Sequence, residues 1–208
     1  MRTRGPGTSL LFLLTIASCS AGMDAGDPPD SAPRPDTAAA ADAPAYADAA
    51  QAADATLSAD EPPSLTGITA AHNAIRGAHG VAPIVWDAQL AAIAQAWTDR
   101  CVDTAAPTGL IDLNPDATTS YGSYVGQNVY GNSGTTTGQD AVNAWASEES
   151  NYNYANNTCS GSCGSYTQIV WANSTKLGCG FTQCPSMTYG YSIVCHYAPG
   201  GNDGNRPY

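Results

Sequence analysis

Basic side chains are scarce in this sequence of 208 residues. It has seven Lys and Arg against eighteen Asp and Glu, which gives a formal net charge of −11 at pH 7. Proteins that hold nucleic acid by its phosphates need clustered positive charge, so we expect no nucleic-acid partner. Long apolar runs are lacking too. The run from Leu10 to Ala17 is much shorter than the about 20 residues of a membrane-spanning helix, so a lipid anchor is the only membrane attachment that we expect.

Tryptophan is absent from the first 85 residues, and this part of the chain offers little material for a core. Residues 20–63 are rich in Ala, Pro and Asp, with nine acidic residues against one Arg. Such a stretch buries too little apolar surface to offset the entropy lost on ordering. We therefore divide the chain into an N-terminal segment 1–19, a disordered linker 20–63 and a folded domain 64–208.

The N-terminal segment has the pattern of an export signal. Arg2 and Arg4 precede the short apolar run, as in secretory signal peptides. The run continues to Cys19 as Leu-Thr-Ile-Ala-Ser-Cys, which resembles the bacterial lipobox. That resemblance implies acylation of Cys19 and, because Ser20 is not Asp, an outer-membrane location. The alternative is an ordinary signal peptide that is cleaved near residue 22, with Cys19 discarded.

Hydrophobic periodicity predicts three helices in the domain. Apolar residues and His72 recur at helical spacing over 65–79, and Gly80 and Pro83 end that helix. Asp87 is placed to cap a second helix, whose apolar face runs from Leu90 to Cys101. A third helix is predicted over 137–149, with Val142, Trp145 and Ala146 inward and Glu148 near the edge of that face.

Near the end of the chain, large apolar residues recur at every second position. Leu177, Cys179 and Phe181 alternate with small or polar residues, as do the odd-numbered residues from Tyr189 to Tyr197. This pattern predicts two strands that form a hairpin through Pro185 and Ser186. Helices followed by strands indicate an α+β fold, in which helices cover a small antiparallel sheet.

The domain contains an even number of cysteines. Behind an export signal, six cysteines indicate three disulfides, with 15 pairings left open. Metal ligation is the alternative, because Cys159 lies close to Cys163 and Cys179 close to Cys184 in the sequence. However, no His lies near either of these pairs to complete a metal site. With every cysteine paired, no thiolate remains for catalysis. The six are Cys101, Cys159, Cys163, Cys179, Cys184 and Cys195.

Three ordered motifs resemble the CAP superfamily of cysteine-rich secretory proteins, venom antigens and plant pathogenesis-related proteins. They are Ala71–Arg76 followed by Pro83–Asp87, then Gly164–Trp171, then Val194–Asn202. The likeness covers about residues 65–208, and the closing residues 202–208 are most similar to the plant branch. It implies an α-β-α sandwich with three disulfides.

The resemblance also implies a cleft of two His and two Glu that can bind zinc, but most of that set is missing here. Ser165 stands in place of one His, and Gln127 in place of one Glu. The stretch between Cys101 and Gly126 contains no His for the other position. Only Glu148 matches. Zinc needs about three or four good donors, so we expect a degenerate cleft with no metal and no cofactor.

The histidines and the cleft leave an enzymatic alternative open. We expect His72 to pack within the first helix, His79 to lie at the C-terminus of that helix, and His196 to face solvent from a strand. A hydrolase using Ser165 and Glu148, with His196 as base, is conceivable from the sequence alone. Such triads are recognised by geometry, and we assign no catalytic residue.

Some CAP proteins carry sterols or fatty acids, so the resemblance favours a non-enzymatic binding module with a lipid or sterol ligand. Residues 102–125 are rich in small residues and could form the mouth of a site, with Tyr121 and Tyr124 lining it. A purely structural or interaction domain, exported to the cell surface or beyond, is the remaining alternative.

Overall fold

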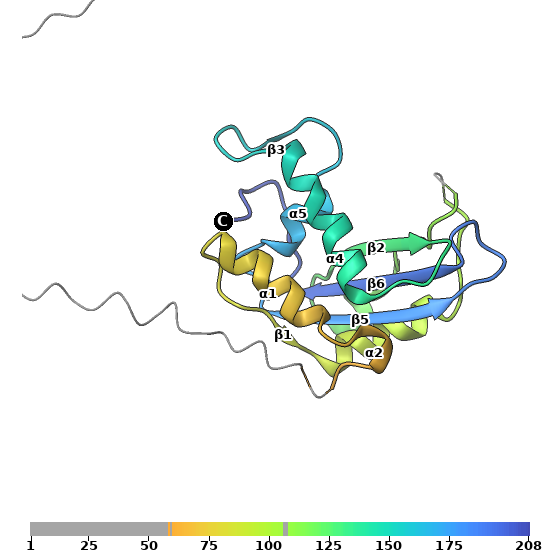
Figure 1. Cartoon of the computed structure of the whole chain (residues 1–208). Helices are drawn as coiled ribbons and strands as arrows, with labels where there is room; N and C mark the ends of the chain where they lie inside the picture. The colour runs from red at the N-terminus through yellow and green to blue at the C-terminus, as the bar shows by residue number, and fades with distance from the viewer. Residues whose placement is uncertain (1–57, 59, 106–107) are drawn as a thin grey trace, which may run out of the picture. The chain divides into compact units, whose positions relative to one another are not determined.

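The computed structural model describes residues 58, 60–105 and 108–208 (Figure 1). The predicted export signal, Cys19 and nearly all of the predicted linker lie outside these residues. Within the described ranges, no helix is both long enough and apolar enough to span a bilayer.

The domain has five α-helices and two short 3-10 helices among its described residues. The 3-10 helices are η1 (Pro63–Leu65) and η2 (Ser147–Asn151). The α-helices are α1 (Ile68–Ala78), α2 (Ala88–Thr98), α3 (Ala117–Tyr121), α4 (Gly138–Ala146) and α5 (Gly164–Ile169). The strands are β1 (Val85–Trp86), β2 (Gly126–Asn132), β3 (Tyr152–Asn153), β4 (Thr158–Cys159), β5 (Lys176–Gln183) and β6 (Tyr191–Ala198).

Four strands form one sheet in the order β1-β5-β6-β2. β5, β6 and β2 are antiparallel neighbours, whereas the two-residue β1 pairs with β5 in parallel, so the sheet is mixed. Helix α2 covers one face, and α1, α4 and α5 lie on the other (Figure 1). The expected α-β-α sandwich is therefore confirmed, with one parallel pair added at the edge.

Helix α2 approaches the sheet very closely because two glycines of β5 face it. A Cβ atom at Gly178 would overlap the backbone of Ala91, and one at Gly180 would lie 2.5 Å from the backbone nitrogen of Gln95. Any larger residue at these positions would force the helix away from the strand. The small residues that alternate along β5 thus set the spacing of this layer.

The predicted elements match the structure in type, with differences at their ends. The Asp87 side chain caps α2 by accepting from the Leu90 amide at 2.9 Å. The third predicted helix becomes α4 followed by η2. Cys101, expected on the apolar face of α2, instead follows the helix with a left-handed φ of 47°. The hairpin of β5 and β6 is confirmed.

Three disulfides link the six cysteines of the domain. Cys101–Cys184 joins the end of α2 to the end of β5, and Cys179–Cys195 links β5 to β6 in the buried core. Cys159–Cys163 closes a short loop before α5. The expected disulfides are therefore present, and the pairing that the sequence left open is fixed by strand register and loop closure.

Candidate functional site

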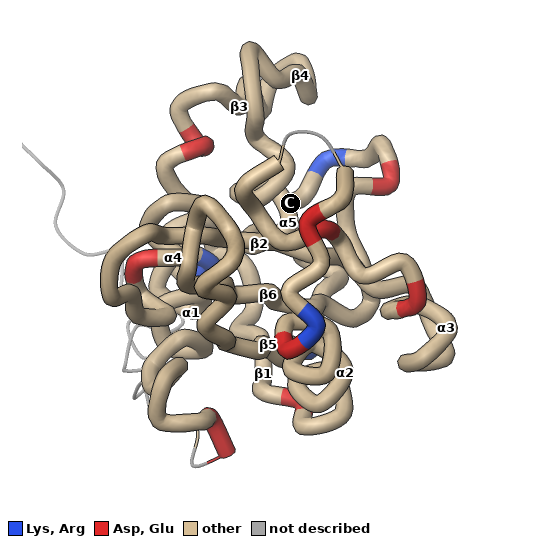
Figure 2. Tube along the Cα trace, turned by 90° about the vertical axis from the view of Figure 1, so that its right-hand side faces the viewer, with Lys and Arg blue, Asp and Glu red and all other residues tan. Residues whose placement is uncertain are grey.

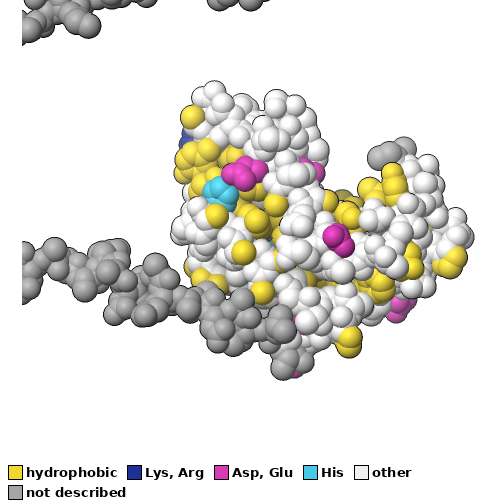
Figure 3. Space-filling model, in the orientation of Figure 1, with side chains coloured by type: hydrophobic (Ala, Val, Ile, Leu, Met, Phe, Trp, Pro, Cys, Tyr) yellow, Lys and Arg dark blue, Asp and Glu magenta, His cyan; other side chains and the backbone are white. Residues whose placement is uncertain are grey.

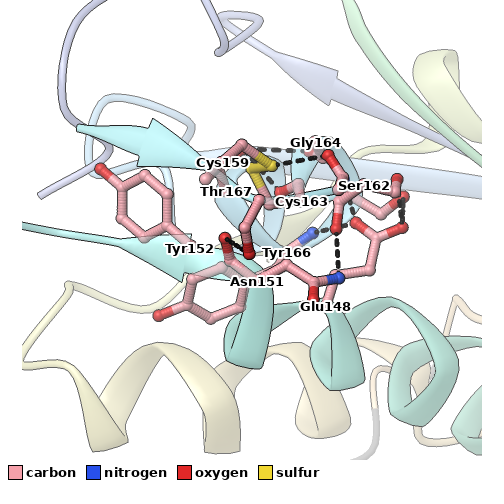
Figure 4. The surroundings of a disulfide bond; sticks show 12 residues. Glu148, Asn151, Tyr152, Cys159, Ser162, Cys163, Gly164, Tyr166 and Thr167 are labelled. Atoms are coloured by element: carbon pink, nitrogen blue, oxygen red, sulfur yellow. Dashed lines mark hydrogen bonds between the residues drawn. A yellow bond between two sulfur atoms is a disulfide. The ribbon is translucent and has the colours of Figure 1, made fainter. Parts of the chain in front are cut away.

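Glu148 lies on η2 and faces the first turn of α5. Its Oε2 accepts hydrogen bonds from the backbone amides of Ser165 at 2.8 Å and Tyr166 at 3.3 Å. Its Oε1 accepts from the hydroxyls of Ser162 at 2.9 Å and Ser165 at 3.3 Å. Figure 4 shows the carboxylate beside Ser162, in the loop closed by the Cys159–Cys163 disulfide. The structure therefore brings two of the expected cleft residues, Glu148 and Ser165, into contact.

The Glu148 carboxylate is fully engaged in hydrogen bonds to the protein. Four donors surround its two oxygens, and two of them are amides that begin a helix and lack intrahelical partners. Glu148 thus fixes the loop before α5 and the start of that helix.

Gln127, the third expected cleft residue, makes its contacts elsewhere. On β2 its side-chain oxygen accepts from the Asn114 amide at 2.8 Å, and its amide nitrogen donates to the Asn114 carbonyl at 3.0 Å. The next residue, Asn128, donates to the Ser165 carbonyl and to the Tyr197 hydroxyl, both at 3.0 Å. Neighbouring strand residues point to opposite faces. Gln127 is thus turned away from the face on which Glu148 and Ser165 meet.

The residues of this cleft do not fit zinc. A zinc site uses deprotonated thiolates, imidazoles or carboxylates in tetrahedral arrangement, and Glu148 supplies the one such group here. Ser165 and Gln127 offer a neutral hydroxyl and a neutral amide, both engaged in hydrogen bonds to protein. Across the described part of the chain, no three His, Cys, Asp or Glu side chains converge as metal ligands would.

The expectation that His196 faces solvent is wrong. The residue is fully buried on β6, paired with Gly178 and Gln127. Its side chain points opposite to that of Tyr197, toward α2, because the glycines of β5 leave room there. Burial lowers the pKa of His196 to about 4, against a smaller opposing effect of the Leu90 backbone. No triad with Ser165 forms, since the two side chains lie on opposite faces of the sheet.

The other two histidines occupy the positions that the sequence indicates. His72 is fully buried between α1 and the sheet. His79 caps the C-terminus of α1, with Nε2 at 3.4 Å from the Glu149 carboxylate and 3.2 Å from the Tyr166 hydroxyl. Figure 3 shows a histidine side chain beside an acidic one in a patch of apolar side chains. His79 contacts Tyr166 but makes no hydrogen bond to Ser165 within the described residues.

A separate pocket lies on the α2 side of the domain, and we call it the Trp97 pocket. It has a volume of about 610 Å³. The Trp97 indole donates to the Asp112 carbonyl at 2.7 Å, which fixes one wall. Tyr121 and Tyr124, expected at the mouth, are not lining residues: their hydroxyls bond to Asp87 and Gly201. The apolar lining comprises Trp97, Val102, Ala105, Leu110, Ile111, Leu113, Pro115 and Val129.

The chain matches the model of the cysteine-rich secretory protein family, CAP, over residues 69–197. The chain therefore belongs to the CAP family. It is 43% identical over 138 residues to Pathogenesis-related protein 1 of Arabidopsis thaliana, covering 66% of this chain and 78% of that protein. Pathogenesis-related leaf protein 4 of Solanum lycopersicum is 42% identical over 142 residues, with 67% and 80% covered.

Solved structures show the same CAP fold. Venom allergen-like protein 4 of Schistosoma mansoni superimposes with a TM-score of 0.53 at 29% identity, covering 68% of this chain and 90% of that chain. A crystal structure of NaASP2 with Zn²⁺ gives 0.54 at 22% identity, covering 68% and 82%. Membership of a secretory family and three disulfides together indicate an exported protein.

Sequence reasoning missed several residues that build this CAP domain. Asn114 bonds to Gln127 and Asn128 bonds to Ser165, yet isolated asparagines carry no periodic signal. The strand β2 was also missed. Its sequence, Gly-Gln-Asn-Val-Tyr-Gly-Asn, has two glycines and few β-branched residues, so its propensity is weak.

Proposed function

We propose that this exported CAP protein is a non-enzymatic binding module that holds a lipid or sterol in the Trp97 pocket. The observation that carries the proposal is the pocket itself. Its volume of about 610 Å³ falls within the range of small-molecule sites, and its walls are chiefly apolar. Burial of an apolar ligand surface there would supply the driving force for binding.

The few polar groups at the pocket are suited to orienting such a ligand. Thr104 and Asp112 line it, and the Asp112 carboxylate accepts from both the amide and the hydroxyl of Thr104. Basic residues lie apart from one another along the described trace (Figure 2), and Arg76 is fully buried. These features favour a largely uncharged ligand over a polyphosphate.

The former metal cleft supports a binding role over hydrolysis. A serine hydrolase needs a base within hydrogen-bond reach of the nucleophile. The group that the Ser165 hydroxyl contacts is the Glu148 carboxylate, at 3.3 Å, and this carboxylate is already engaged by the Ser162 hydroxyl and by two amides at the start of α5. We therefore assign Ser165 and Glu148 to the support of the fold.

Two matched variants test the lipid proposal. Leu113 lines the pocket and is 57% exposed, whereas Val85 lies outside it and is 58% exposed. Leu113→Glu should place a charge in the pocket wall without disturbing the core, and Val85→Glu should add the same charge elsewhere. The purified domain is titrated with cis-parinaric acid and with dehydroergosterol, and native mass spectrometry identifies any lipid retained from the cell.

We expect saturable binding of at least one probe, weakened at least tenfold by Leu113→Glu and unchanged by Val85→Glu. Competition by the retained lipid should identify its class. The proposal fails if neither probe binds and no lipid is retained, or if the two variants bind alike.

We further propose that Cys19 carries the lipid anchor. The lipobox-like run ending at Cys19 supports this, together with its position before an acidic, Ala- and Pro-rich stretch. Cells expressing the full chain are labelled with radioactive palmitate, alongside the Cys19→Ala variant. Label in the wild type and none in the variant is expected. An unlabelled wild-type protein would favour the ordinary signal peptide instead.

A further inference from the structure

Two polar pockets lie around the β3–β4 hairpin, on the side of the domain away from the Trp97 pocket. The larger, of about 520 Å³, is lined by residues 150–154 and 158–160. The smaller, of about 240 Å³, lies between the hairpin, Trp171 and the closing residues 202–207. Both are lined by Tyr152, Thr158 and Cys159, so they adjoin. We call them the hairpin pockets.

Every side chain that lines the hairpin pockets is uncharged. Asparagine amides and Ser or Thr hydroxyls alternate with the aromatic rings of Tyr152, Tyr154 and Trp171. Amides can donate and accept together, and hydroxyls do the same. Aromatic rings offer an apolar face next to these polar groups. A ligand that fits must therefore be neutral, rich in hydroxyl or amide groups, and apolar on one face.

The walls are held in place before any ligand binds. The Tyr152 hydroxyl donates to Asn157 Oδ1 at 2.9 Å, and Asn157 Nδ2 donates to the Gly204 carbonyl at 3.1 Å. Arg206 donates to the carbonyls of Tyr154 at 3.0 Å and Ala155 at 2.7 Å, which ties the hairpin to the chain end. The Cys159–Cys163 disulfide closes the remaining side. A preformed site loses less entropy on binding.

Some polar groups of the pockets are left available. The Thr158 hydroxyl makes no hydrogen bond to any described residue, although Thr158 lines both pockets. Trp171 lines the smaller pocket as well. A bound ligand with hydroxyl groups would bond to the Thr158 hydroxyl.

We propose that the hairpin pockets bind a neutral saccharide. Sugar hydroxyls would bond to the amides and to Thr158, while a C–H face of the ring would lie on a tyrosine. Anionic ligands are disfavoured because the adjacent Arg206 guanidinium is engaged with two hairpin carbonyls and the chain carries a net charge of −11. Apolar lipids are disfavoured by the polar walls. This site is independent of the Trp97 pocket.

The test uses isothermal titration and saturation-transfer NMR with cellotriose, maltotriose and N,N′,N″-triacetylchitotriose, and with trigalacturonate as the anionic comparison. Thr158→Val removes one hydroxyl and keeps the shape, and Thr175→Val is its exposed control outside the pockets. Thermal midpoints confirm that each variant is folded.

We expect at least one neutral trisaccharide to bind saturably and more tightly than trigalacturonate. Thr158→Val should weaken binding about five- to tenfold, as for the loss of one good contact, and Thr175→Val should leave it unchanged. Leu113→Glu should also leave it unchanged, which separates this site from the lipid site. The proposal is overturned if no neutral trisaccharide binds at millimolar concentration, if trigalacturonate binds best, or if Thr158→Val binds like the wild type.

Discussion

The ring of His72 lies 2.8 Å from the hydroxyl of Tyr197, between α1 and the sheet. Its Nδ1 lies 2.8 Å from the Ile68 carbonyl oxygen, which can only accept, so Nδ1 carries the proton. Nε2 is then the acceptor of the Tyr197 hydroxyl, which in turn accepts from Asn128 Nδ2 at 3.0 Å. Burial lowers the pKa of His72 to about 4, so the imidazole that takes part in these hydrogen bonds is neutral at pH 7.

Stability should fall as the pH drops from about 6.5 toward 4. Burial lowers the pKa of both His72 and His196 from 6.5 to about 4. Between pH 4 and pH 6.5 the two histidines bind protons in the unfolded chain but not in the folded chain, so the free energy of unfolding rises with pH. Protonation of each histidine lowers the free energy of unfolding by about 2 to 4 kcal/mol, and this loss is absent above pH 6.5. Urea denaturation at pH 4.5, 5.5 and 7.5 measures the effect.

His196→Leu isolates one of the two histidines. Apart from the weak interaction with the Leu90 backbone, the His196 nitrogens make no hydrogen bond among the described residues, so an apolar replacement removes a poorly paired buried polar group. We expect the variant to be as stable as the wild type at pH 7.5 or more so, and to lose about half of the pH dependence. An unaltered pH profile in His196→Leu would contradict the assignment.

Arg76 should be among the residues least tolerant of substitution. It is fully buried, and its guanidinium donates to the carbonyls of Ala82, Ile169, Trp171 and Ser174 at 2.8 to 2.9 Å. Lysine has no planar fork to reach these carbonyls. We expect Arg76→Lys to cost about 3 kcal/mol or more, measured by chemical denaturation.

The exposed Arg100 provides the comparison for this variant. Its guanidinium lies 4.7 Å from the ring centroid of Trp97 at the surface. Arg100→Lys should change the free energy of unfolding by less than about 0.5 kcal/mol. Equal costs for the two substitutions would be inconsistent with the role of the buried guanidinium.

We expect the Glu148 side chain to stabilise the folded domain. Glu148→Ala leaves the amides of Ser165 and Tyr166 without their carboxylate partner. The expected cost is about 1 to 3 kcal/mol, by analogy with the loss of helix caps and buried acceptors. Glu149→Gln, one residue away, should cost less, since that side chain is 55% exposed. Denaturant titration compares the two, and the reverse order would argue against the capping role.

We predict that the chain does not bind stoichiometric zinc at Glu148. The neighbouring Ser165 is neutral, and the neutral Gln127 side chain lies on the opposite face of the sheet, bonded to Asn114. Calorimetric titration of the purified domain with zinc chloride measures this directly. One-to-one binding that disappears in Glu148→Ala would refute the prediction.

The three disulfides should contribute unequally. Their sequence separations are 83 residues for Cys101–Cys184, 16 for Cys179–Cys195 and 4 for Cys159–Cys163. Closing a longer loop restricts the unfolded chain more, so replacing the first pair by alanines should cost about 4 to 5 kcal/mol and the last about 2 kcal/mol. Unfolding of the two double variants tests this order.

Patterns of spacing and capping allowed much of the fold to be predicted. The period of α1, the Asp87 cap of α2 and the alternation along β5 and β6 are all local, and each appears in the structure. The burial of His196 was not predictable in this way. It depends on Gly178, which lies opposite in the neighbouring strand and lets α2 close over the ring. Strand register decides which residues lie opposite one another in neighbouring strands, and hydrophobic periodicity does not show that register.

The sequence alone determined the CAP family, through ordered motifs, and the neutral character of Ser165 and Gln127, through their identities. Both follow from residue identities, which the sequence gives directly. Only the tertiary structure decided the disulfide pairing, the contact of Glu148 with the start of α5 and the position of the pockets. Each depends on distances between residues far apart in the chain, and packing of the helices on the sheet fixes those distances.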